Sequence, residues 1–418
     1  APDIRNVYAA DDSERQSSHD CANCVKFFGS SLWPKRCQEQ PRPIVDDYQS
    51  LVGEAYKKIA TTEPVSAAFL ADEDVADREV TEEQTYDAEA KEAQLRAEAA
   101  LWNTTSPKPA RAGDVPTIDV GEWFRTNDEG ELHRLGAALR RASQEVGFYQ
   151  LVGHEVPPLE LNAILQQAKL FHSLPKRTKH DLAMDMPEHH VGGVGYLGYG
   201  NWKLPSRSNP NQNAAYVVKT DHRIAFDDNH WPQEVVLPGF RSAVERYAAL
   251  AKGLAERLLP IYAVALDLPA DYFQVAFEEP FFRLRMTHYR PREGDGESFG
   301  IHPHVDTSFI TLLITDGTPG LNIFSRRRNE WIQMPTPRPN AFIVNSGELL
   351  RQWSNDKFLS TRHFVTNASK RDRYSVPFFF TPNSDYKMEC LPTCCGADNP
   401  PKYPPFSYNE SQGRVQGE

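Results

Sequence analysis

Two histidines and one aspartate in the C-terminal half of the chain have the residue types and the spacing of a metal site. His304 and Asp306 are separated by a single valine, so in a strand both side chains would project from the same face. His363 lies further along the chain, in another segment of strand character. Two imidazoles and one carboxylate can bind one face of a metal ion and leave the opposite face open, as in sites for non-haem Fe(II). Because the short His-x-Asp pattern also occurs by chance, the alternative is a histidine and an aspartate at the exposed end of a strand.

A second group of polar residues has the chemistry of a carboxylate site. Arg373 and Ser375 flank a tyrosine at the start of a predicted strand and share one face of it. A guanidinium binds a carboxylate through two N–H groups, and a hydroxyl adds a further hydrogen bond. An arginine that faces the inside of a barrel without an anion would be costly, so the pair predicts an anionic ligand rather than an arginine that faces water. The same alternation turns Arg285 inward, which makes it a candidate for binding a substrate carboxylate or for contributing to a cosubstrate site.

Short segments with a hydrophobic period of two follow one another in the last third of the chain and must position these side chains. Gly, Pro, Asn and Asp separate the segments, a pattern typical of a β-sandwich or barrel. Phe309 and Phe379 lie in these segments, where an aromatic side chain lines either a substrate pocket or the core, and we keep both as candidate pocket residues. His302, beside Pro303, is expected to be a partly exposed turn residue; the alternative is a residue on the strand face of His304 that supports the metal ligands. The predicted strands cover residues 282–289, 307–314, 321–324, 331–333, 341–345, 361–366 and 374–380.

The preceding part of the chain is predicted to be mainly helical. Apolar residues recur there at helical spacing, and Pro260 is expected to kink the longest helix. Residues 191–213 are rich in Gly, Ser, Asn and Pro, which predicts a long loop that could act as a lid. The predicted helices cover residues 131–146, 159–172 and 240–268, and short strands are predicted at residues 115–120 and 147–152.

Composition and charge exclude several classes of protein. The chain of 418 residues carries 57 acidic and 46 basic residues, a net charge of −11, whereas proteins that bind nucleic acid are usually basic. No segment reaches the ~18 consecutive apolar residues that a membrane-spanning helix needs, so we expect neither a nucleic-acid nor a membrane partner. The six cysteines lie near the two ends of the chain, which favours a reducing, cytoplasmic location over a disulfide scaffold.

Several motifs follow one another in a defined order along the chain. From residue 289 to residue 380 they are a tyrosine, His-Val-Asp, Asn-Ser-Gly-Glu, Trp-Ser-Asn, a histidine, Arg-Tyr-Ser and Phe-Phe-Phe. Upstream, Val-Pro-Thr-Ile-Asp at 115–119 and the segments 147–154 and 171–175 complete the series. Together these motifs resemble the Fe(II)- and 2-oxoglutarate-dependent oxygenases of the isopenicillin N synthase-like superfamily, over residues 113–385.

The resemblance implies a fold that is mainly β with helices: a double-stranded β-helix, or jelly-roll, core with a helical N-terminal region packed on it. We therefore expect a catalytic jelly-roll domain at residues 271–418, ending in a proline-rich tail, and a helical dioxygenase region at residues 113–270. Residues 1–112 form a long N-terminal extension, in which an acid-rich helix and a proline-containing linker are predicted.

The resemblance also assigns roles to individual residues. Three positions match the iron ligands of the family: His304, Asp306 and His363. Arg373 and Ser375 match the pair that binds the far carboxylate of 2-oxoglutarate, and Tyr289 matches the tyrosine of an Asn-x-Tyr pattern that contacts the same carboxylate. Thr287 replaces the asparagine of that pattern here.

The activity implied is that of an oxidoreductase, a dioxygenase of small-molecule metabolism that needs Fe(II), 2-oxoglutarate and O2. In such enzymes 2-oxoglutarate is oxidatively decarboxylated to succinate and CO2 while a small organic substrate is hydroxylated, desaturated or cyclised. One alternative is an Fe(II) oxidase of the same superfamily that does not use 2-oxoglutarate, in which Arg373 and Ser375 would hold a carboxylate of the substrate. Another is a non-catalytic jelly-roll binding protein. The sequence predicts neither the substrate nor the oligomeric state.

Overall fold

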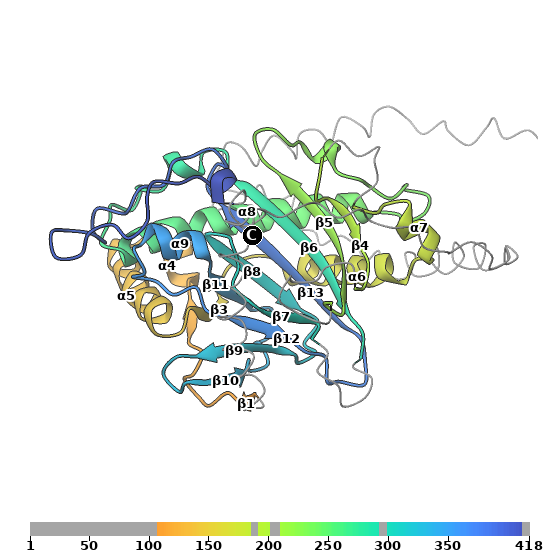
Figure 1. Cartoon of the computed structure of the whole chain (residues 1–418), viewed down its shortest axis with the longest axis horizontal. Helices are drawn as coiled ribbons and strands as arrows, with labels where there is room; N and C mark the ends of the chain where they lie inside the picture. Colours follow the sequence, from red (N-terminus) through yellow and green to blue (C-terminus); the bar gives the residue numbers. More distant parts are fainter. Residues whose placement is uncertain (1–106, 185–190, 201–209, 292–298, 412–418) are drawn as a thin grey trace, which may run out of the picture. The chain divides into compact units, whose positions relative to one another are not determined.

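The computed structural model describes residues 107–184, 191–200, 210–291 and 299–411. The acid-rich helix predicted in the N-terminal extension and the N-terminal cysteines lie outside the described residues. Within the described part, two β-sheets face one another and helices cover one of them (Figure 1). No helix in this part of the chain is both long and apolar enough to cross a membrane.

The strands of the described residues form an eight-stranded and a five-stranded sheet. In spatial order the larger sheet consists of β2 (Thr117–Asp119), β3 (Phe148–Val152), β11 (Phe342–Ser346), β8 (Ile310–Thr315), β13 (Arg373–Thr381), β6 (Phe281–Tyr289), β5 (Asn213–Thr220) and β4 (Gly195–Leu197). The smaller sheet consists of β1 (Lys108–Pro109), β10 (Glu330–Gln333), β9 (Leu321–Ser325), β12 (His363–Val365) and β7 (Ile301–His304). From β6 to β13 the chain passes repeatedly between the two sheets, and the orders β11-β8-β13-β6 and β10-β9-β12-β7 are those of a jelly roll.

Helices cover the outer face of the eight-stranded sheet, which is the face turned away from the five-stranded sheet. The long helices α5 (Glu129–Glu145), α6 (Pro158–Ser173) and α8 (Phe240–Ala265) pack on the strands and on one another. Each coincides with a helix predicted from hydrophobic periodicity, and α8 continues through Pro260. Shorter helices are α4 (Gly121–Thr126), α7 (Lys176–His180) and α9 (Glu348–Trp353), with 3₁₀ helices at Phe226–Asp228 and Val275–Phe277.

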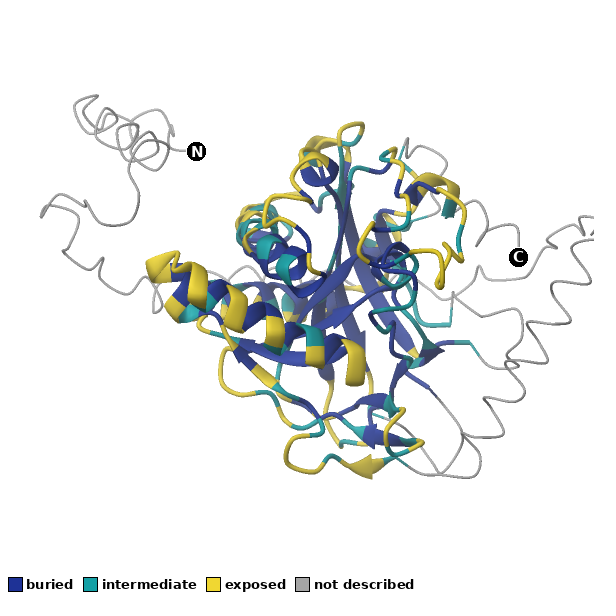
Figure 2. Ribbon diagram, turned by 90° about the vertical axis from the view of Figure 1, so that its left-hand side faces the viewer, coloured by how far each residue is buried: buried dark blue, intermediate teal, exposed yellow. Residues whose placement is uncertain are grey.

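The two faces of the eight-stranded sheet differ in chemistry because side chains alternate along each strand. On the outer face, apolar side chains such as Leu284, Met286 and Phe378 are fully buried against the helices, and each contributes about 1.5–3 kcal/mol by leaving water. The inner face is turned toward the five-stranded sheet and shares a smaller apolar cluster with it, which includes Leu313 and Ile323. Figure 2 shows the strands mostly buried, whereas the helices keep an exposed side. The outer face therefore holds the main core, and the inner face has room for polar side chains.

A strand lies where the sequence predicted part of a long loop. Gly195–Leu197 forms β4 and pairs with β5, which in turn pairs with β6. The prediction of one continuous loop over residues 191–213 is therefore wrong in part. Gly195 has a φ of +99°, and a Cβ at this position would lie 2.5 Å from the carbonyl oxygen of Leu182. This glycine permits close approach of two backbones at a strand, and does not mark a loop.

Candidate metal centre and cosubstrate site

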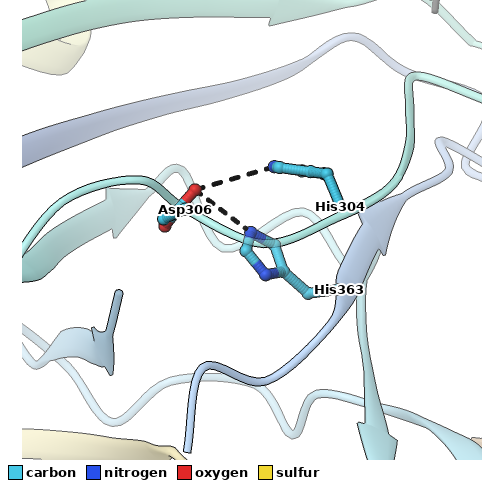
Figure 3. A group of neighbouring side chains, drawn as sticks. All are labelled: His304, Asp306 and His363. Atoms are coloured by element: carbon cyan, nitrogen blue, oxygen red, sulfur yellow. Dashed lines mark ion pairs between the residues drawn. The ribbon is translucent and has the colours of Figure 1, made fainter. Parts of the chain in front are cut away.

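The side chains of His304, Asp306 and His363 meet between the two sheets, although His363 is distant from the others in sequence (Figure 3). His304 ends β7 and is the direct partner of His363, the first residue of β12. The Nε2 atoms of His304 and His363 are 3.7 and 3.6 Å from Oδ1 of Asp306. One potential ligand atom from each residue lies within 4.8 Å of the other two, so all three side chains can bind one ion.

Asp306 reaches the histidines from the connection between β7 and β8 and not from a strand. β7 ends at His304, before Asp306, and the next strand begins at Ile310 rather than at residue 307. The expectation that His304 and Asp306 share the face of one strand is therefore wrong, although the two side chains do meet. Hydrogen-bond donors on the eight-stranded sheet orient the Asp306 carboxylate instead.

Two side chains of the eight-stranded sheet hold the Asp306 carboxylate. The hydroxyl of Thr311 on β8 donates to Oδ2 at 2.8 Å, and Nδ2 of Asn345 on β11 donates to the same oxygen at 2.9 Å. The backbone N–H of Glu348 donates to the Asp306 carbonyl at 2.7 Å. Because Oδ2 is occupied, Oδ1 is the oxygen that faces the imidazoles. Hydrogen bonds of this kind orient a metal ligand and strengthen metal binding.

A glycine lets β11 approach the connection that carries Asp306. A Cβ on Gly347 would lie only 1.9 Å from the carbonyl oxygen of Ser308, so no other residue fits here. The N–H of Gly347 donates to the Phe309 carbonyl at 3.0 Å. The Asn-Ser-Gly-Glu motif thus has a structural reason: its first residue binds the carboxylate, its third provides space, and its fourth binds the backbone.

Backbone carbonyls orient both imidazoles. Nδ1 of His304 lies 2.7 Å from the carbonyl oxygen of His302, and Nδ1 of His363 lies 3.1 Å from that of Thr361. A carbonyl only accepts, so each Nδ1 carries the proton and each Nε2 keeps the lone pair that a metal needs. His302 is itself buried inside β7, with Nδ1 2.6 Å from Oδ1 of Asn211. The expectation of a partly exposed turn residue is therefore wrong, because β7 extends over this position.

Burial and neighbouring charges shift the pKa values of His304 and Asp306 in the direction that favours metal binding. Burial, together with the charge that His363 carries when protonated, lowers the pKa of His304 to about 4. Burial alone would raise the pKa of Asp306, but the two histidines and the hydrogen bonds from Asn345 and Thr311 bring this pKa below its ordinary value. Near neutral pH the site therefore offers a neutral imidazole and a carboxylate anion, the protonation states that bind metal. A donor set of two nitrogens and one carboxylate oxygen fits Fe(II).

Arg373 is buried on the inner face, in space that a glycine provides. Its side chain is 1% exposed, Nε donates to the Thr318 carbonyl at 3.2 Å, and Nη1 donates to Oγ of Ser375 at 3.4 Å. A Cβ at Gly320 would lie 3.2 Å from Cδ of Arg373. No carboxylate of the described residues pairs with this guanidinium. A buried and unneutralised cation is costly, and a bound carboxylate would relieve that cost.

Tyr289 and Thr287 lie beside this pair on β6. They are the direct strand partners of Arg373 and Ser375, so all four side chains share the inner face. The guanidinium carbon of Arg373 is 4.8 Å from the centre of the Tyr289 ring, a cation–π contact that holds the arginine in place. Thr287 is 1% exposed and offers a hydroxyl where the family pattern has an amide. The structure thus brings together the three residues that the resemblance assigned to the cosubstrate.

The three candidate pocket residues have different surroundings. Arg285 and Phe379 are partly buried on the inner face, and the guanidinium carbon of Arg283 lies 4.8 Å above the Phe379 ring. Phe309 instead is fully buried in the core that the strands share with the helices. The expectation of a pocket position does not hold for Phe309, because other rings enclose it: those of Tyr262, Phe273, Phe277 and Trp353.

Sequence reasoning missed the residues that orient the aspartate. It predicted no role for Thr311 or Asn345, although Asn345 belongs to a motif that carries the resemblance. A signal is present in the sequence, because each is a polar residue in a mainly apolar strand. Buried polar side chains of this kind need a polar partner.

Comparisons with known proteins agree with this geometry. Residues 279–382 match the family model described as the 2OG-Fe(II) oxygenase superfamily, and residues 115–234 match the model described as non-haem dioxygenase in morphine synthesis N-terminal. A 2-oxoglutarate-Fe(II) type oxidoreductase of Emericella nidulans, hxnY, is 30% identical over 323 residues, which are 72% of this chain and 91% of the relative. Kihadalactone A synthase LFS of Citrus sinensis is 32% identical over 293 residues, which are 66% of this chain and 85% of the relative.

A solved structure shows the same fold. A full-length Neurospora crassa protein, crystallised in complex with alpha-KG and thymine, superposes with a TM-score of 0.64 and 26% identity, over 72% of this chain and 96% of that chain. The likeness confirms the jelly-roll core that the motifs implied. The chain belongs to the 2OG-Fe(II) oxygenase superfamily and is an oxidoreductase of the dioxygenase type, which uses Fe(II), 2-oxoglutarate and O2.

Proposed function

We propose that this enzyme hydroxylates, desaturates or cyclises a small organic molecule at a centre formed by His304, Asp306 and His363, with release of succinate and CO2. The observation that carries this proposal is the convergence of two imidazole Nε2 atoms on one carboxylate oxygen, at 3.7 and 3.6 Å. The unneutralised guanidinium of Arg373 lies on the inner face that is turned toward this centre. A metal site and an anion site between the same two sheets are what a dioxygenase of this type needs.

The triad and its supporting residues have separate tasks. When bound, Fe(II) supplies open coordination positions and redox chemistry toward dioxygen. The carboxylate of Asp306 offsets one charge of the ion, so the centre keeps a net positive charge that attracts an anionic cosubstrate. Thr311 and Asn345 occupy Oδ2 and so keep Oδ1 turned to the histidines.

Arg373 and Ser375 bind the far carboxylate of 2-oxoglutarate in this proposal. The guanidinium is already immobilised by the Tyr289 ring and the Thr318 carbonyl, so little side-chain freedom is lost when the anion binds. A hydrogen bond to a charged group contributes about 1.5–3 kcal/mol. The cosubstrate is therefore held at its distal end by a preorganised cation.

Two alternatives make other demands on the same residues. An Fe(II) oxidase that takes no 2-oxoglutarate would use Arg373 and Ser375 to hold the carboxylate of its substrate. A non-catalytic jelly-roll protein would have no need of an Fe(II) site. Relatives named as 2-oxoglutarate-Fe(II) type oxidoreductases support the dioxygenase over both.

Succinate formation is the decisive test. The full-length protein is loaded anaerobically with Fe(II), and then receives 2-oxoglutarate, O2 and one member of a small-molecule panel. We expect a substrate to stimulate succinate formation, with one succinate per substrate converted. Conversion of substrate without succinate would favour the oxidase. Failure to bind Fe(II) in the anaerobic titration would exclude the three residues as a metal centre.

The substrate in this proposal is a small molecule. The Neurospora crassa structure holds thymine, which supports a small-molecule substrate for this chain by analogy of fold. The cytoplasmic location stays a prediction from cysteine usage; the cysteines within the described residues, Cys390, Cys394 and Cys395, are free thiols.

A further inference from the structure

Three basic side chains gather on the inner face of the eight-stranded sheet, apart from Arg373. Lys219 lies on β5, and Arg283 and Arg285 lie on β6. All three are partly buried, and none pairs with a carboxylate among the described residues. Cations in such surroundings are costly unless an anion joins them.

The register of the sheet places this basic cluster on the same side as the metal ligands. Thr311 on β8, whose hydroxyl binds Asp306, is the strand partner of Phe379 on β13. Phe379 pairs with Arg283, and Arg283 pairs with Lys219. Because direct partners project from the same face, one row of side chains leads from the support of the metal ligand to the cations. Neighbouring strands are ~4.8 Å apart, so the backbones of Thr311 and Arg283 are separated by ~10 Å.

The two guanidinium groups are incompletely paired. Nε of Arg283 and Nε of Arg285 are shielded from solvent and form no hydrogen bond within the part of the chain that the structure describes. Arg283 stacks on Phe379, and Arg285 reaches Oδ1 of Asn213 only at 3.5 Å. Burial and the charge of Arg283 lower the pKa of Arg285 to about 10, and the same two causes lower the pKa of Lys219. A carboxylate would satisfy these N–H groups and neutralise part of the charge.

Arg283 and Lys219 lie apart from the proposed cosubstrate site. Arg283 is the strand partner of Phe379, whereas Arg373 is the partner of Tyr289. At ~3.3 Å per residue, the stretch of β13 from Arg373 to Phe379 spans ~20 Å. Arg285 lies between the two ends, two residues from Thr287 on the same face of β6. An anion bound at the cluster would therefore approach the metal centre from one end of β13, whereas 2-oxoglutarate would approach it from the other end.

We propose that Arg283 and Arg285, with Lys219 beside them, bind a carboxylate of the primary substrate, so that the enzyme acts on small organic acids. This proposal rests on the proposed dioxygenase function and names the substrate class of the same site. The guanidinium groups bind the carboxylate through charged hydrogen bonds, and the remainder of the acid lies between the cluster and the triad.

Matched pairs of acids and amides test the proposal. The iron-loaded full chain, with 2-oxoglutarate saturating, receives small aromatic and aliphatic carboxylic acids and the primary amide of each, and succinate is measured. We expect kcat/KM to be about 10- to 100-fold higher for the preferred acid than for its amide, as a charged hydrogen bond would produce. Arg283→Gln should reduce this preference by a similar factor. Arg246→Gln, which removes an exposed arginine from α8, is the matched control and should keep the preference.

The outcomes distinguish the two proposals. Equal stimulation by acids and amides, an acid preference that survives Arg283→Gln, or no stimulation by any acid while 2-oxoglutarate still binds would each overturn the acid-substrate proposal alone. Calorimetric titration of 2-oxoglutarate into Arg283→Gln and Arg373→Gln gives a further check. Equal weakening in both variants would assign the cluster to the cosubstrate and overturn the proposal. Loss of both Fe(II) and 2-oxoglutarate binding in the unmodified protein would overturn the dioxygenase function itself.

Discussion

The two faces of the eight-stranded sheet are built from the same strands and have opposite chemistry. On β13, Val376, Phe378 and Phe380 point outward and are fully buried hydrocarbon. Arg373 and Ser375 point inward and carry a charge and a hydroxyl that a ligand can use. The contrast shows that neighbouring residues of one strand can serve stability and binding separately. Substitutions one or two positions apart should therefore affect different properties.

The largest effect is expected when the carboxylate of the metal centre is removed. Asp306→Ala should abolish succinate formation, because it deletes one of the three proposed ligands and the acceptor for Thr311 and Asn345. The far-UV circular dichroism should not change, since Asp306 lies in a connection outside the main core. Asp227→Ala, which removes an exposed carboxylate, is the control. Turnover in Asp306→Ala would remove this residue from the ligand set.

Alanine substitutions of the two phenylalanines that the sequence proposed for the pocket compare how closely the two faces of the sheet are packed. Phe309→Ala should lower the free energy of unfolding by about 3–5 kcal/mol, because it opens a cavity among packed rings. Phe379→Ala should lower the free energy of unfolding by less than half of that amount, since the Phe379 ring is only partly buried beneath Arg283. Urea denaturation of both variants measures the difference. Equal destabilisation would mean that the inner face is as closely packed as the outer one.

Arg373→Ala should weaken 2-oxoglutarate binding by about 1.5–3 kcal/mol, or ~10- to 150-fold in Kd, because it removes charged hydrogen bonds to the distal carboxylate. Titration calorimetry with the iron-loaded protein measures the constant. Arg246→Ala on the exposed side of α8 controls for the loss of a positive charge. An unchanged Kd would contradict the assignment of Arg373 to the cosubstrate and would reopen the oxidase alternative.

The smallest of these effects is expected at a residue that contacts a metal ligand rather than the metal. Asn345→Ala removes one of the two hydrogen bonds to Oδ2 of Asp306 and should reduce the affinity for Fe(II) by about 10- to 100-fold. Anaerobic titration measures the affinity. Thr311→Val removes the other hydrogen bond at similar volume and should have a comparable effect. If neither variant binds iron more weakly, the supporting hydrogen bonds do not orient the carboxylate.

The sequence predicted the long helices and most strands because their periodicity extends over many residues. The stripe of α8 and the alternation in β6 and β13 depend on local pattern alone, and all three elements agree closely with their predicted bounds. The order of motifs located the triad and Arg373 on the inner side of the fold. The helices and strands are determined by residues that are near one another in the chain, whereas the triad was located by the order of motifs over a longer stretch.

The features that were missed depend on contacts between distant segments. Gly195 reads as a loop residue, but pairing with β5 makes it part of a strand. Asp306 reads as a strand residue, but β7 ends two positions earlier. Phe309 could have lined a pocket, and only the rings that surround it in the fold assign it to the core. The alternation of side chains along β6 predicted that Arg285 faces inward. That Arg285 lies beside Arg283 and Lys219 could be learned only from the register of β5 and β6.

The triad takes its residues from one sheet and its support from the other. Both histidines stand on strands of the five-stranded sheet, while Asp306 is tied to β8 and β11 of the eight-stranded sheet. A metal ion that binds all three therefore works as a cross-link through the middle of the sandwich. Binding to the folded state alone stabilises a protein by about 2.7 kcal/mol when the free ligand is at 100 times its Kd. The resistance of this enzyme to heat and proteolysis should accordingly follow the supply of iron, so that metal starvation shortens the lifetime of the protein as well as stopping its chemistry.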